Sequence, residues 1–359
     1  MGARCTVSRM SRSLTLDGRA VSDDTDCWVI AEVGHNHQGD IEKAKDLFRA
    51  AKECGADAVK LQKRENKTLY TRAFYDKPYE NSHSYGATYG EHREALEFGR
   101  DQYVELAKFC REIGITFFAT AFDTASADFL EELAMPLYKL ASGDLLNIPL
   151  MKHVAQFGKP MIVSVGGGTL DDVRRVYDAV TPINTQLCFL QCTMSYPTPP
   201  EEVNLRVIST LREAFPDTVV GLSDHYNGIA LAPAAYVLGA RVIEKHFTLQ
   251  HTWKGTDHAL SLEPIGMKKM VRDLKRIRAA LGDGNKRVFA SEKPAIGKMG
   301  KSLYAKTDLP ADHLIAESDL AVKSPGGGLP PYELGRIVGR RLKTALKKDD
   351  AVQLTHLES

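Results

Sequence analysis

Apolar runs of the length of a β-strand alternate with amphipathic segments along most of the chain. Runs rich in β-branched and aromatic residues predict buried strands, and apolar residues spaced three and four apart predict helices. Helices are predicted over about 40–54, near 147–157 and in stretches such as DTASADFLEELA, which opens with an Asp/Thr capping signal. The predicted strands, each followed by a helix, are 27–34, 58–63, 116–122, 137–142, 160–167, 187–193, 219–225 and 242–249.

This order of elements predicts a TIM barrel. Strands that alternate with helices indicate a parallel sheet, and eight strand–helix units in about 255 residues match the size of a (β/α)8 barrel. A doubly wound open sheet is the competing architecture. No GxGxxG motif follows the first predicted strand to favour that sheet. We therefore expect residues 1–282 to form a barrel domain.

Two stretches depart from the strand–helix period. The loop after the second predicted strand, about residues 64–100, is much longer than typical connections. Its aromatic, glycine and histidine residues favour a functional loop at the barrel mouth over polar disorder. After residue 282, short apolar runs are broken by Pro, Gly and Asp. We predict a linker over 283–294 and a small β-rich domain over 295–359.

Composition and charge exclude several classes of function. The 359 residues carry 47 basic and 46 acidic side chains, so there is no basic excess to bind nucleic acid. No apolar stretch approaches the ~20 residues of a membrane span, and the N-terminal residues lack a signal-peptide pattern. The six cysteines form no CxxC pair, which is typical of reduced thiols. We expect a cytoplasmic protein without a nucleic acid or membrane partner.

The opening residues MGARCT fit the loose pattern for N-myristoylation, with Gly2 as the acceptor and Thr6 at the hydroxyl position. The pattern is short and often matches by chance. A single acyl chain would in any case hold the protein to a membrane only marginally. The unmodified chain is therefore the favoured form.

Polar residues collect where the predicted strands end. Catalytic groups in a TIM barrel come from the carboxyl ends of the strands, and residues two apart on a strand share a face. In VIEKHFTL, Glu244 and His246 would therefore face the barrel mouth, while Lys245 faces away with no partner evident in the sequence. The candidates collected in this way are Glu32, Lys60, Gln62, Thr120, Lys139, Ser142, Ser164, Tyr196, Ser223, His225, Glu244, His246 and Asp257.

Two of these candidates predict a metal site. His225 and His246 end neighbouring strands of a closed barrel, so their side chains can converge. Two neutral imidazoles with water suit a divalent transition metal such as manganese, iron or zinc. A single histidine is more often structural than a ligand, so the hypothesis depends on the convergence of the pair.

The lysines predict an anion site. Lys60 and Lys139, together with hydroxyls from several strands, would form a cationic pocket rich in hydrogen-bond donors. A buried ammonium needs a negative partner, and a small substrate with a phosphate and a carboxylate would satisfy both lysines. Salt bridges to Glu32 and Glu244 are the alternative.

Ordered motifs along nearly the whole chain resemble those of the sialic acid synthase (N-acetylneuraminate synthase) family. The family condenses phosphoenolpyruvate with the open-chain aldehyde of an N-acylhexosamine, which gives a sialic (nonulosonic) acid and phosphate. The resemblance therefore implies an enzyme of the transferase class. The C-terminal string VKSPGGGLPP is similar to the antifreeze-like (SAF) domain that follows the barrel in this family. The matching barrel motifs are IAEVGHNHQGD, GADAVKLQK, TYGEH, YKLASGD, KPMIVSVGG, LQCTMSYPTPPEEVNL, GLSDH, IEKHFTL and GTDHALSLEP.

The resemblance also implies roles for individual residues. His225 and His246 match the metal ligands, with Mn²⁺ expected and Mg²⁺ or Co²⁺ as alternatives. Either Glu32 or Glu244 could orient the attacking water. The C-terminal domain of one subunit caps the barrel of the other in this family, so we expect a domain-swapped homodimer. The residues that match phosphoenolpyruvate contacts are Lys60, Thr120, Lys139, Ser142, Ser164 and Ser223. Those that match positions around the sugar, the metal water and proton transfer are Glu32, Gln62, Tyr196, Glu244 and Asp257.

Three positions depart from the family pattern. Met194 stands where many bacterial members have Asn, which removes one contact to phosphoenolpyruvate. Asp144 stands where some members have Glu, so its reach to the metal water is shorter. Ser324 stands where many members have an Arg that reaches the N-acyl group of the sugar. The neighbouring Lys323 is the candidate substitute, although Lys is not equivalent to Arg.

Several readings of the function follow. N-acetylmannosamine or its 6-phosphate is the favoured sugar, because the loop with YGEH and Tyr85 is more similar to sialic acid synthases. A diacetamido-trideoxyhexose, leading to legionaminic or pseudaminic acid, is the alternative substrate. A non-catalytic sugar- or ice-binding protein would have a decayed barrel rim, whereas the rim here is intact. A metal aldolase would leave the C-terminal domain unexplained.

Overall fold

The computed structural model describes residues 12–358 and divides the chain into two compact units, Met1–Gly282 and Asp283–Ser359. The candidate acylation site at Gly2 and the thiol of Cys5 lie outside the described residues. The other five cysteines are buried and unpaired as disulfides. Within the described part of the chain, no helix combines the length and the apolar character needed to cross a membrane.

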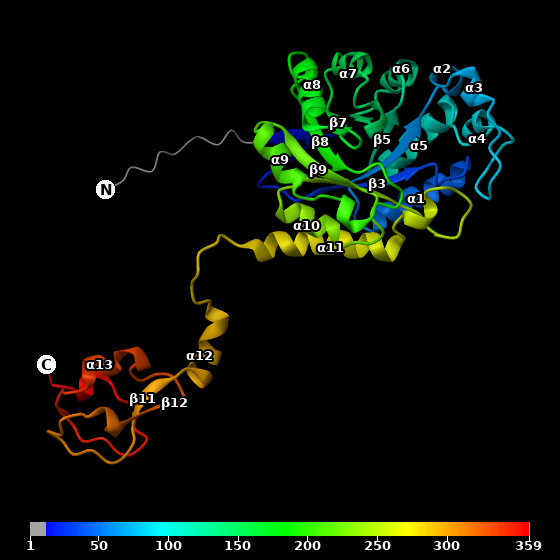
Figure 1. The fold of residues 1–359 in the computed structure, drawn as a ribbon. Helices are drawn as coiled ribbons and strands as arrows, with labels where there is room; N and C mark the ends of the chain where they lie inside the picture. Colours follow the sequence, from blue (N-terminus) through cyan, green and yellow to red (C-terminus); the bar gives the residue numbers. More distant parts are fainter. Residues whose placement is uncertain (1–11, 359) are drawn as a thin grey trace. The chain divides into compact units, whose positions relative to one another are not determined.

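The larger unit is a closed barrel of parallel strands, as the alternation of elements predicts (Figure 1). The strands follow one another around the barrel in chain order, and the last pairs with the first, which excludes an open sheet. They are β3 (Trp28–Gly34), β4 (Ala58–Lys63), β5 (Thr116–Ala121), β6 (Tyr138–Leu140), β7 (Met161–Ser164), β8 (Leu187–Cys192), β9 (Val219–Asp224) and β10 (Val242–His246).

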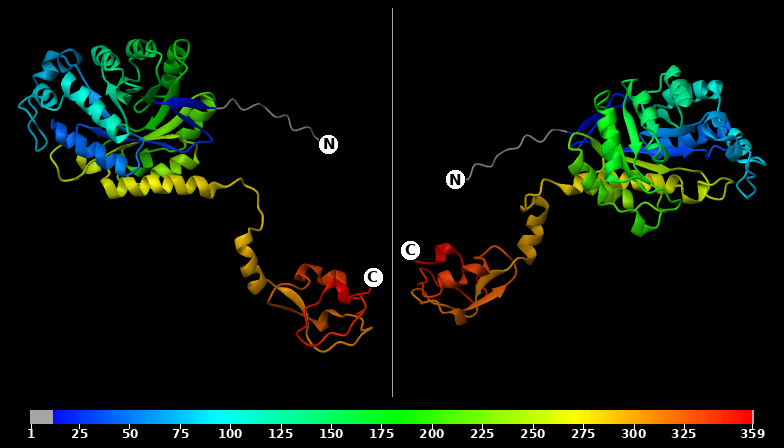
Figure 2. Two further views of the ribbon diagram at one scale, coloured as in Figure 1. Left: turned by 180° about the vertical axis from the view of Figure 1, so that it is seen from behind. Right: turned by 45° about the horizontal axis from the view of Figure 1, so that its top comes forward.

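Helices follow the strands and cover the outer face of the barrel, where α11 (Pro264–Leu281) runs along its outside (Figure 2). The predicted capping signal is confirmed at Asp123, whose carboxylate accepts a hydrogen bond from the backbone N–H of Ser126 at 2.7 Å. The helices are α1 (Ile41–Glu53), α5 (Arg100–Ile113), α6 (Thr124–Glu132), α7 (Ile148–Ala155), α8 (Leu170–Val180), α9 (Val207–Ala214), α10 (Leu231–Val237) and α11 (Pro264–Leu281).

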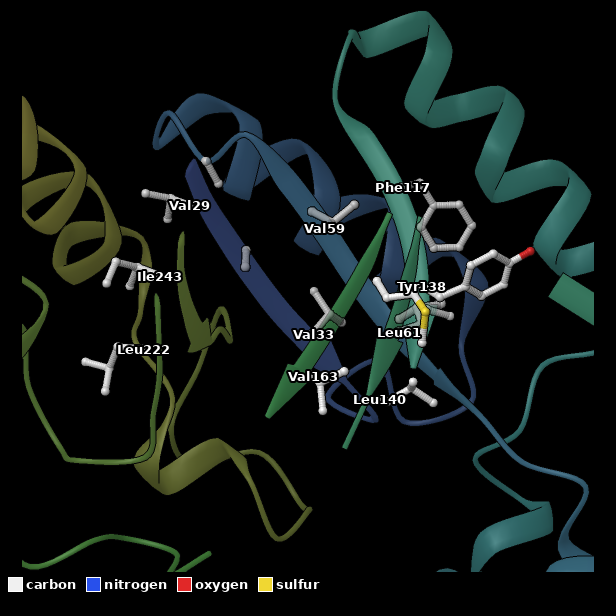
Figure 3. Packing of buried hydrophobic residues seen from close by; sticks show 14 of the residues in the cluster. Val29, Val33, Val59, Leu61, Phe117, Tyr138, Leu140, Val163, Leu222 and Ile243 are labelled. Atoms are coloured by element: carbon white, nitrogen blue, oxygen red, sulfur yellow. The ribbon is translucent and has the colours of Figure 1, made fainter. Parts of the chain in front are cut away.

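Alternate residues of each strand build two separate apolar layers. Val29, Val59 and Ile243 belong to the layer between strands and helices (Figure 3). Trp28 and Phe118 belong to the layer inside the barrel. Apolar residues fill the barrel interior at the amino ends of the strands. The polar side chains that face the interior therefore lie toward the carboxyl ends of the strands.

A short hairpin that the sequence-based prediction missed adds to the inner layer. Its strands are β1 (Ser13–Leu16) and β2 (Arg19–Ser22), and Leu14, Leu16 and Val21 belong to the same buried cluster as Trp28. The turn residues Asp17 and Gly18 both have positive φ, as a tight two-residue hairpin requires. An Asp-Gly pair is a known hairpin signal, so this element could have been found.

The long loop after β4 is not a single open loop. It contains α2 (Asn66–Leu69), α3 (Arg72–Tyr75) and α4 (Tyr89–Glu94). A capping box between Thr88 and Glu91 fixes the start of α4. The rings of Tyr70, Phe74, Tyr79, Tyr85, Tyr89 and His92 pack on one another.

The smaller unit has its own apolar core, which includes Leu303, Leu342 and Val352. Its regular strands are β11 (Ser302–Ala305) and β12 (Leu320–Lys323), which pair antiparallel. Isolated β-bridges join further segments, such as Leu309 with Leu346. Helix α12 (Lys293–Met299) spans the end of the predicted linker, and α13 (Leu334–Ile337) is a single turn.

Candidate active site

A cavity of about 450 Å³ opens at the carboxyl ends of the barrel strands. All the predicted site residues line it except Asp144 and Lys323. Closure of the barrel brings these side chains together, since every strand contributes at its end. The lining residues that the sequence-based prediction did not single out as site residues are Arg64, Arg93, Phe122, Ala141, Gly143, Cys192, Met194 and Thr256.

The two buried lysines pair with the two buried glutamates. Lys60 Nζ lies 2.6 Å from Glu32 Oε2 and donates to Thr120 Oγ1 at 2.5 Å. Lys139 Nζ lies 3.5 Å from Glu244 Oε1. The salt-bridge alternative is therefore what the structure shows, and burial of the lysines alone does not demand an anion. Each ammonium has three donors, and the described residues provide two partners for Lys60 and two for Lys139, so each lysine that lines the cavity has one donor left.

The pKa values of the two carboxylates are shifted in opposite directions. Burial raises the pKa of Glu32 above its usual range, although Lys60 opposes the shift. Burial would also raise the pKa of Glu244, but the charges of Lys139 and Lys60 lower it below its usual range. Carboxylates whose environments separate their pKa values are suited to different roles in proton transfer and charge stabilisation.

Hydroxyl groups complete the donor set on this side of the cavity. Ser164 Oγ is buried and makes no hydrogen bond within the described residues. Ser142 Oγ accepts from the backbone N–H of Gly166 at 3.0 Å, which leaves its own O–H to donate. Ser223 Oγ donates to Glu244 Oε1 at 3.1 Å. An unsatisfied buried hydroxyl in the same cavity as two ammonium groups favours an anionic ligand there.

The two histidines converge as predicted. The ring centroids of His225 and His246 lie 5.3 Å apart, and the ring of Tyr196 lies 4.0 Å from that of His225. Burial lowers the pKa of His225 to about 4 and also lowers that of His246. Both imidazoles are therefore neutral near pH 7, which is the form that binds metals.

The residues present fit a metal ion with an open coordination sphere. His225 Nδ1 lies 2.9 Å from the carbonyl oxygen of Thr193, so Nδ1 carries the proton and Nε2 keeps its lone pair. His246 Nδ1 is buried without a hydrogen-bond partner among residues 12–358, 3.8 Å from Asp257 Oδ2. The described residues hold no group of three or more His, Cys, Asp or Glu side chains arranged around a metal. Water or substrate oxygens would therefore complete the sphere.

Lys245, which had no evident partner in the sequence, pairs behind the cavity. Its Nζ lies 2.8 Å from Asp224 Oδ2, and both side chains are fully buried. It also donates to the carbonyl oxygen of Tyr226. The ion pair joins β9 to β10 on the face opposite the cavity, so VIEKHFTL carries charges on both faces and each has a partner.

Two predicted site residues are not among the lining of the cavity. Asp144 accepts a hydrogen bond from Asn147 Nδ2 at 3.2 Å in the turn after β6. Lys323 lies in the smaller unit, where its ammonium pairs with Asp349. Lys301 donates to Ser324 Oγ at 2.6 Å in the same unit. Met194 lines the cavity, so that departure from the family pattern does face the ligand space.

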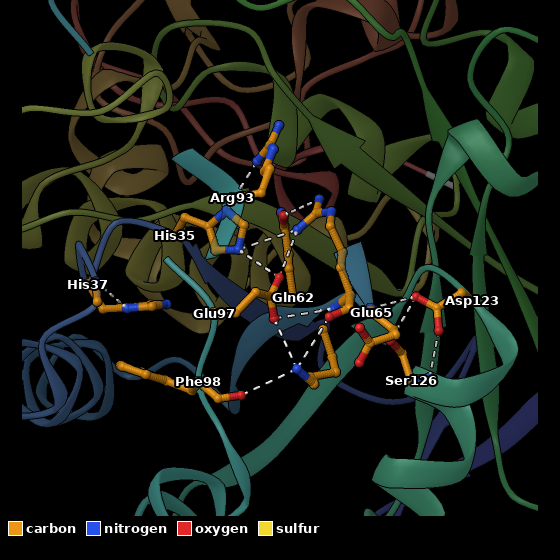
Figure 4. A network of polar contacts seen from close by, with 12 residues as sticks. His35, His37, Gln62, Glu65, Arg93, Glu97, Phe98, Asp123 and Ser126 are labelled. Carbon is orange, nitrogen blue, oxygen red and sulfur yellow. Dashed lines mark hydrogen bonds and ion pairs between the residues drawn. The ribbon is translucent and has the colours of Figure 1, made fainter. Parts of the chain in front are cut away.

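The main cavity residues that the sequence-based prediction missed are Arg64 and Arg93. Figure 4 shows Arg93 beside His35. Arg64 follows β4, donates to Gln62 Oε1 at 2.7 Å and stacks on Phe122 at 3.7 Å from the ring centroid. Arg93 comes from α4 and donates to the hydroxyl of Tyr89 at 2.8 Å. Arg64 continues the alternation of Lys60 and Gln62, which is the signal that could have found it.

Comparison with known proteins agrees with this geometry. N-acetylneuraminate-9-phosphate synthase of Mus musculus is 43% identical over 95% of this chain and 96% of its own length. N,N'-diacetyllegionaminic acid synthase of Legionella pneumophila is 36% identical over 93% of this chain and 95% of its own length. The structure of a sialic acid synthetase from Leptospira borgpetersenii has a TM-score of 0.70 and 29% identity, and the alignment covers 80% of this chain and 96% of that one.

The family models match both units. The NeuB family matches residues 47–286, and the SAF domain matches residues 300–358. The predictions of a barrel with a SAF domain and of an enzyme are confirmed by these matches and by the synthases among the relatives. The chain belongs to the NeuB family and carries a SAF domain at its C-terminal end.

Proposed function

We propose that this enzyme condenses phosphoenolpyruvate with the open-chain aldehyde of an N-acylhexosamine to give a nonulosonic acid and phosphate. The observation that carries the proposal is a single cavity lined by Lys60, Lys139 and the unsatisfied hydroxyl of Ser164 beside two neutral histidines. The first set suits an enol phosphate with a carboxylate. The second set suits an aldehyde oxygen held by a metal.

Different residues of the cavity bind phosphoenolpyruvate and orient the attacking water. Lys60, Lys139 and Ser164 hold the phosphate and carboxylate of phosphoenolpyruvate, while Glu32 and Glu244 stay close enough to offset the ammonium charges. C3 of phosphoenolpyruvate forms a bond to the aldehyde carbon, and the aldehyde oxygen takes up a proton. Water adds to C2, and phosphate leaves with cleavage of the C2–O bond. Glu32 and Glu244 are the groups that can orient this water.

His225 and His246 would hold a divalent metal, for which we propose Mn²⁺. Bound there, the metal would polarise the aldehyde as a Lewis acid. The orientation of His225 is already set by Thr193, which is the support that a metal-binding imidazole needs from its second nitrogen. Asp257 lies beside His246 and raises its basicity through the opposite charge.

N-acetylmannosamine or its 6-phosphate is the sugar that we propose. The relatives with the higher identity are named for a 9-phosphate product, at 43% for both the mouse and the human protein. The alternative is a diacetamido sugar, since the Legionella relative is named for diacetyllegionaminic acid at 36% identity.

Phosphate release tests the proposal. The purified full-length chain is incubated with phosphoenolpyruvate and Mn²⁺, separately with N-acetylmannosamine, with its 6-phosphate and with the diacetamido sugar. We expect release that depends on one of these sugars. Release with none of them, by protein that is folded and loaded with metal, would contradict the proposal.

We also propose a homodimer, in which the SAF domain of one copy covers the barrel of the other. The resemblance to the family supports it. So do the apolar side chains of Met299 and Tyr332 in the smaller unit, which are 65% and 82% exposed in the single chain. Light scattering should give the mass of two chains. A monomer at micromolar concentration would refute this arrangement.

A further inference from the structure

We propose that Arg64 and Arg93 form a second anion site, which binds a phosphate ester on the sugar and so selects the phosphorylated N-acylhexosamine. The inference rests on the proposed function, because it assigns residues to one end of the same substrate. Both side chains line the cavity that holds the lysines and histidines. The steps of the condensation itself leave both arginines without a role.

The positive charge of this pair is poorly compensated. The lysines of the cavity have carboxylates at 2.6 Å and 3.5 Å. Within the described part of the chain, Arg64 pairs only with Glu97, at 3.9 Å, and Glu97 is also paired with Lys63 at 3.2 Å. Arg93 makes no ion pair with any residue of the described chain, residues 12–358. Arg64 therefore shares one distant carboxylate with Lys63, and Arg93 has no carboxylate partner among residues 12–358.

His35 lies between the two arginines and cannot satisfy both. Arg64 Nη1 lies 3.3 Å from His35 Nε2, and Arg93 Nη1 lies 3.3 Å from His35 Nδ1. A neutral imidazole has one acceptor nitrogen, because the other carries a proton. Burial keeps His35 neutral by lowering its pKa well below the usual range. One of the two guanidinium donors is therefore left without an acceptor at His35.

The position of the pair suits the far end of an open-chain sugar. Alternate positions along β4 and just past its end carry Lys60, Gln62 and Arg64. These residues therefore follow one another on one face, from the barrel interior toward the mouth. The backbone rises by about 13 Å over the four residues from Lys60 to Arg64, and the guanidinium of Arg64 reaches back to Gln62 Oε1 at 2.7 Å. In the proposed function the reacting aldehyde lies near the histidines and Glu32, at the end of this row that is deeper in the barrel. The opposite end of the sugar chain, where a 6-phosphate would be attached, then points toward Arg64.

The side chain of Arg64 is fixed in place by its contacts before any ligand binds. Its side chain is only 7% exposed, with one nitrogen on Gln62 and its plane on Phe122. Gln62 in turn donates to Glu32 Oε1 at 2.7 Å, which links the arginine to Glu32 through Gln62. A planar guanidinium offers two parallel donors to a phosphate. The acidic groups whose charge acts on these arginines are Glu97 and Asp144 at Arg64 and Asp257 at Arg93, and of these only Glu97 forms an ion pair with either arginine among residues 12–358.

Kinetics with matched sugars test the assignment. Wild type should show a KM at least tenfold lower for N-acetylmannosamine 6-phosphate than for N-acetylmannosamine. In Arg64→Gln and Arg93→Gln the KM for the phosphorylated sugar should rise about tenfold or more, since each loses a hydrogen bond to a charged group. The rise should be at least fivefold larger than for the unphosphorylated sugar. Arg64→Lys keeps the positive charge but loses the two parallel N–H donors of the guanidinium. Its KM for the phosphorylated sugar should lie between those of wild type and Arg64→Gln.

Two controls distinguish a specific loss of phosphate binding from a general loss of activity or folding. Arg49→Gln removes an exposed arginine of α1 that pairs with Asp46, and it should leave both KM values unchanged. Thermal unfolding of each variant shows whether it is folded. Equal KM values for the two sugars in wild type, or equal losses for both in the variants, would overturn the assignment. The wild-type comparison decides even where a variant does not fold.

A binding experiment distinguishes failure of this inference from failure of the proposed function. Calorimetry is run with the full chain, phosphoenolpyruvate and a chelator, so that no turnover occurs. N-acetylmannosamine 6-phosphate should bind at least tenfold more tightly than N-acetylmannosamine, and added salt should weaken the phosphorylated sugar more. Selective binding without phosphate release in the metal assay would refute the synthase and keep the anion site. Turnover without this selectivity would support the synthase and refute the anion site.

Discussion

Removal of the carboxylate that pairs with Lys245 should be among the most damaging single changes in the barrel. Asp224→Asn keeps the size of the side chain and leaves an ammonium buried. The exposed fractions of the Lys245 and Asp224 side chains are 0% and 1%, and the atoms are 2.8 Å apart, so solvent does not screen the pair. Breaking such a buried pair costs about 3–5 kcal/mol. With about 2–4 °C per kcal/mol for a domain near this size, the unfolding temperature should fall by roughly 6–20 °C.

A double-mutant cycle isolates the ion pair from other effects of the substitutions. Asp224→Asn, Lys245→Met and the double variant are compared by urea unfolding followed by circular dichroism. The double variant should lose at least about 1–2 kcal/mol less than the sum of the single losses, because the second change removes the charge that the first left unpaired. Additive losses, or a loss below about 1 kcal/mol in Asp224→Asn, would refute this reasoning.

The other predictions concern the cavity and its supports. His246→Ala should lose bound Mn²⁺, measured by elemental analysis, and should abolish phosphate release. Ser164→Ala should raise the KM for phosphoenolpyruvate about tenfold, because a hydrogen bond to a charged group is lost. Leu16→Ala should lower the free energy of unfolding by about 2–5 kcal/mol, since Leu16 is fully buried beneath the barrel. Ser324→Arg should change the KM for the sugar and leave that for phosphoenolpyruvate in place.

Each of these has an outcome that would contradict it. Full activity of His246→Ala after chelator treatment would remove His246 from the metal site. An unchanged KM for phosphoenolpyruvate in Ser164→Ala would show that the unsatisfied hydroxyl serves another ligand. Leu354, which is 61% exposed, is the control for Leu16, and equal effects of the two alanine variants would mean that the hairpin does not seal the barrel. Equal effects of Ser324→Arg on both substrates would exclude a specific sugar contact.

The barrel was predictable because parallel strands buried on both faces give continuous apolar runs. The eight runs in the sequence correspond to the eight strands of the barrel, with ends that differ by a few residues. The hairpin at β1 and β2 was missed because its four-residue strands are buried on one face only and so give no continuous apolar run, although Asp17 and Gly18 mark its turn. The helices of the loop after β4 were missed because α2 and α3 are single turns, too short to give a period.

The sequence predicted most of the residues that line the cavity, but it did not predict which of them form contacts with one another. Alternation identifies Lys60 and Glu32 as residues of the barrel interior, but their ion pair depends on the register of β3 against β4, where they are direct partners. Register is set by packing over the whole sheet and is not visible in either strand alone. Arg93 was missed because it reaches the cavity from α4, on a segment with no strand period.

Strands β9 and β10 show how much follows once the register is known. Ser223 lies opposite Glu244 and donates to it inside the barrel, while Asp224 lies opposite Lys245 and pairs with it outside. The next inward positions are the two histidines. A slip of one residue would exchange the two faces, and in one direction it would bring Asp224 opposite Glu244. Like charges would then meet where solvent is excluded. The charges that look misplaced in VIEKHFTL therefore fix the register that brings His225 and His246 together.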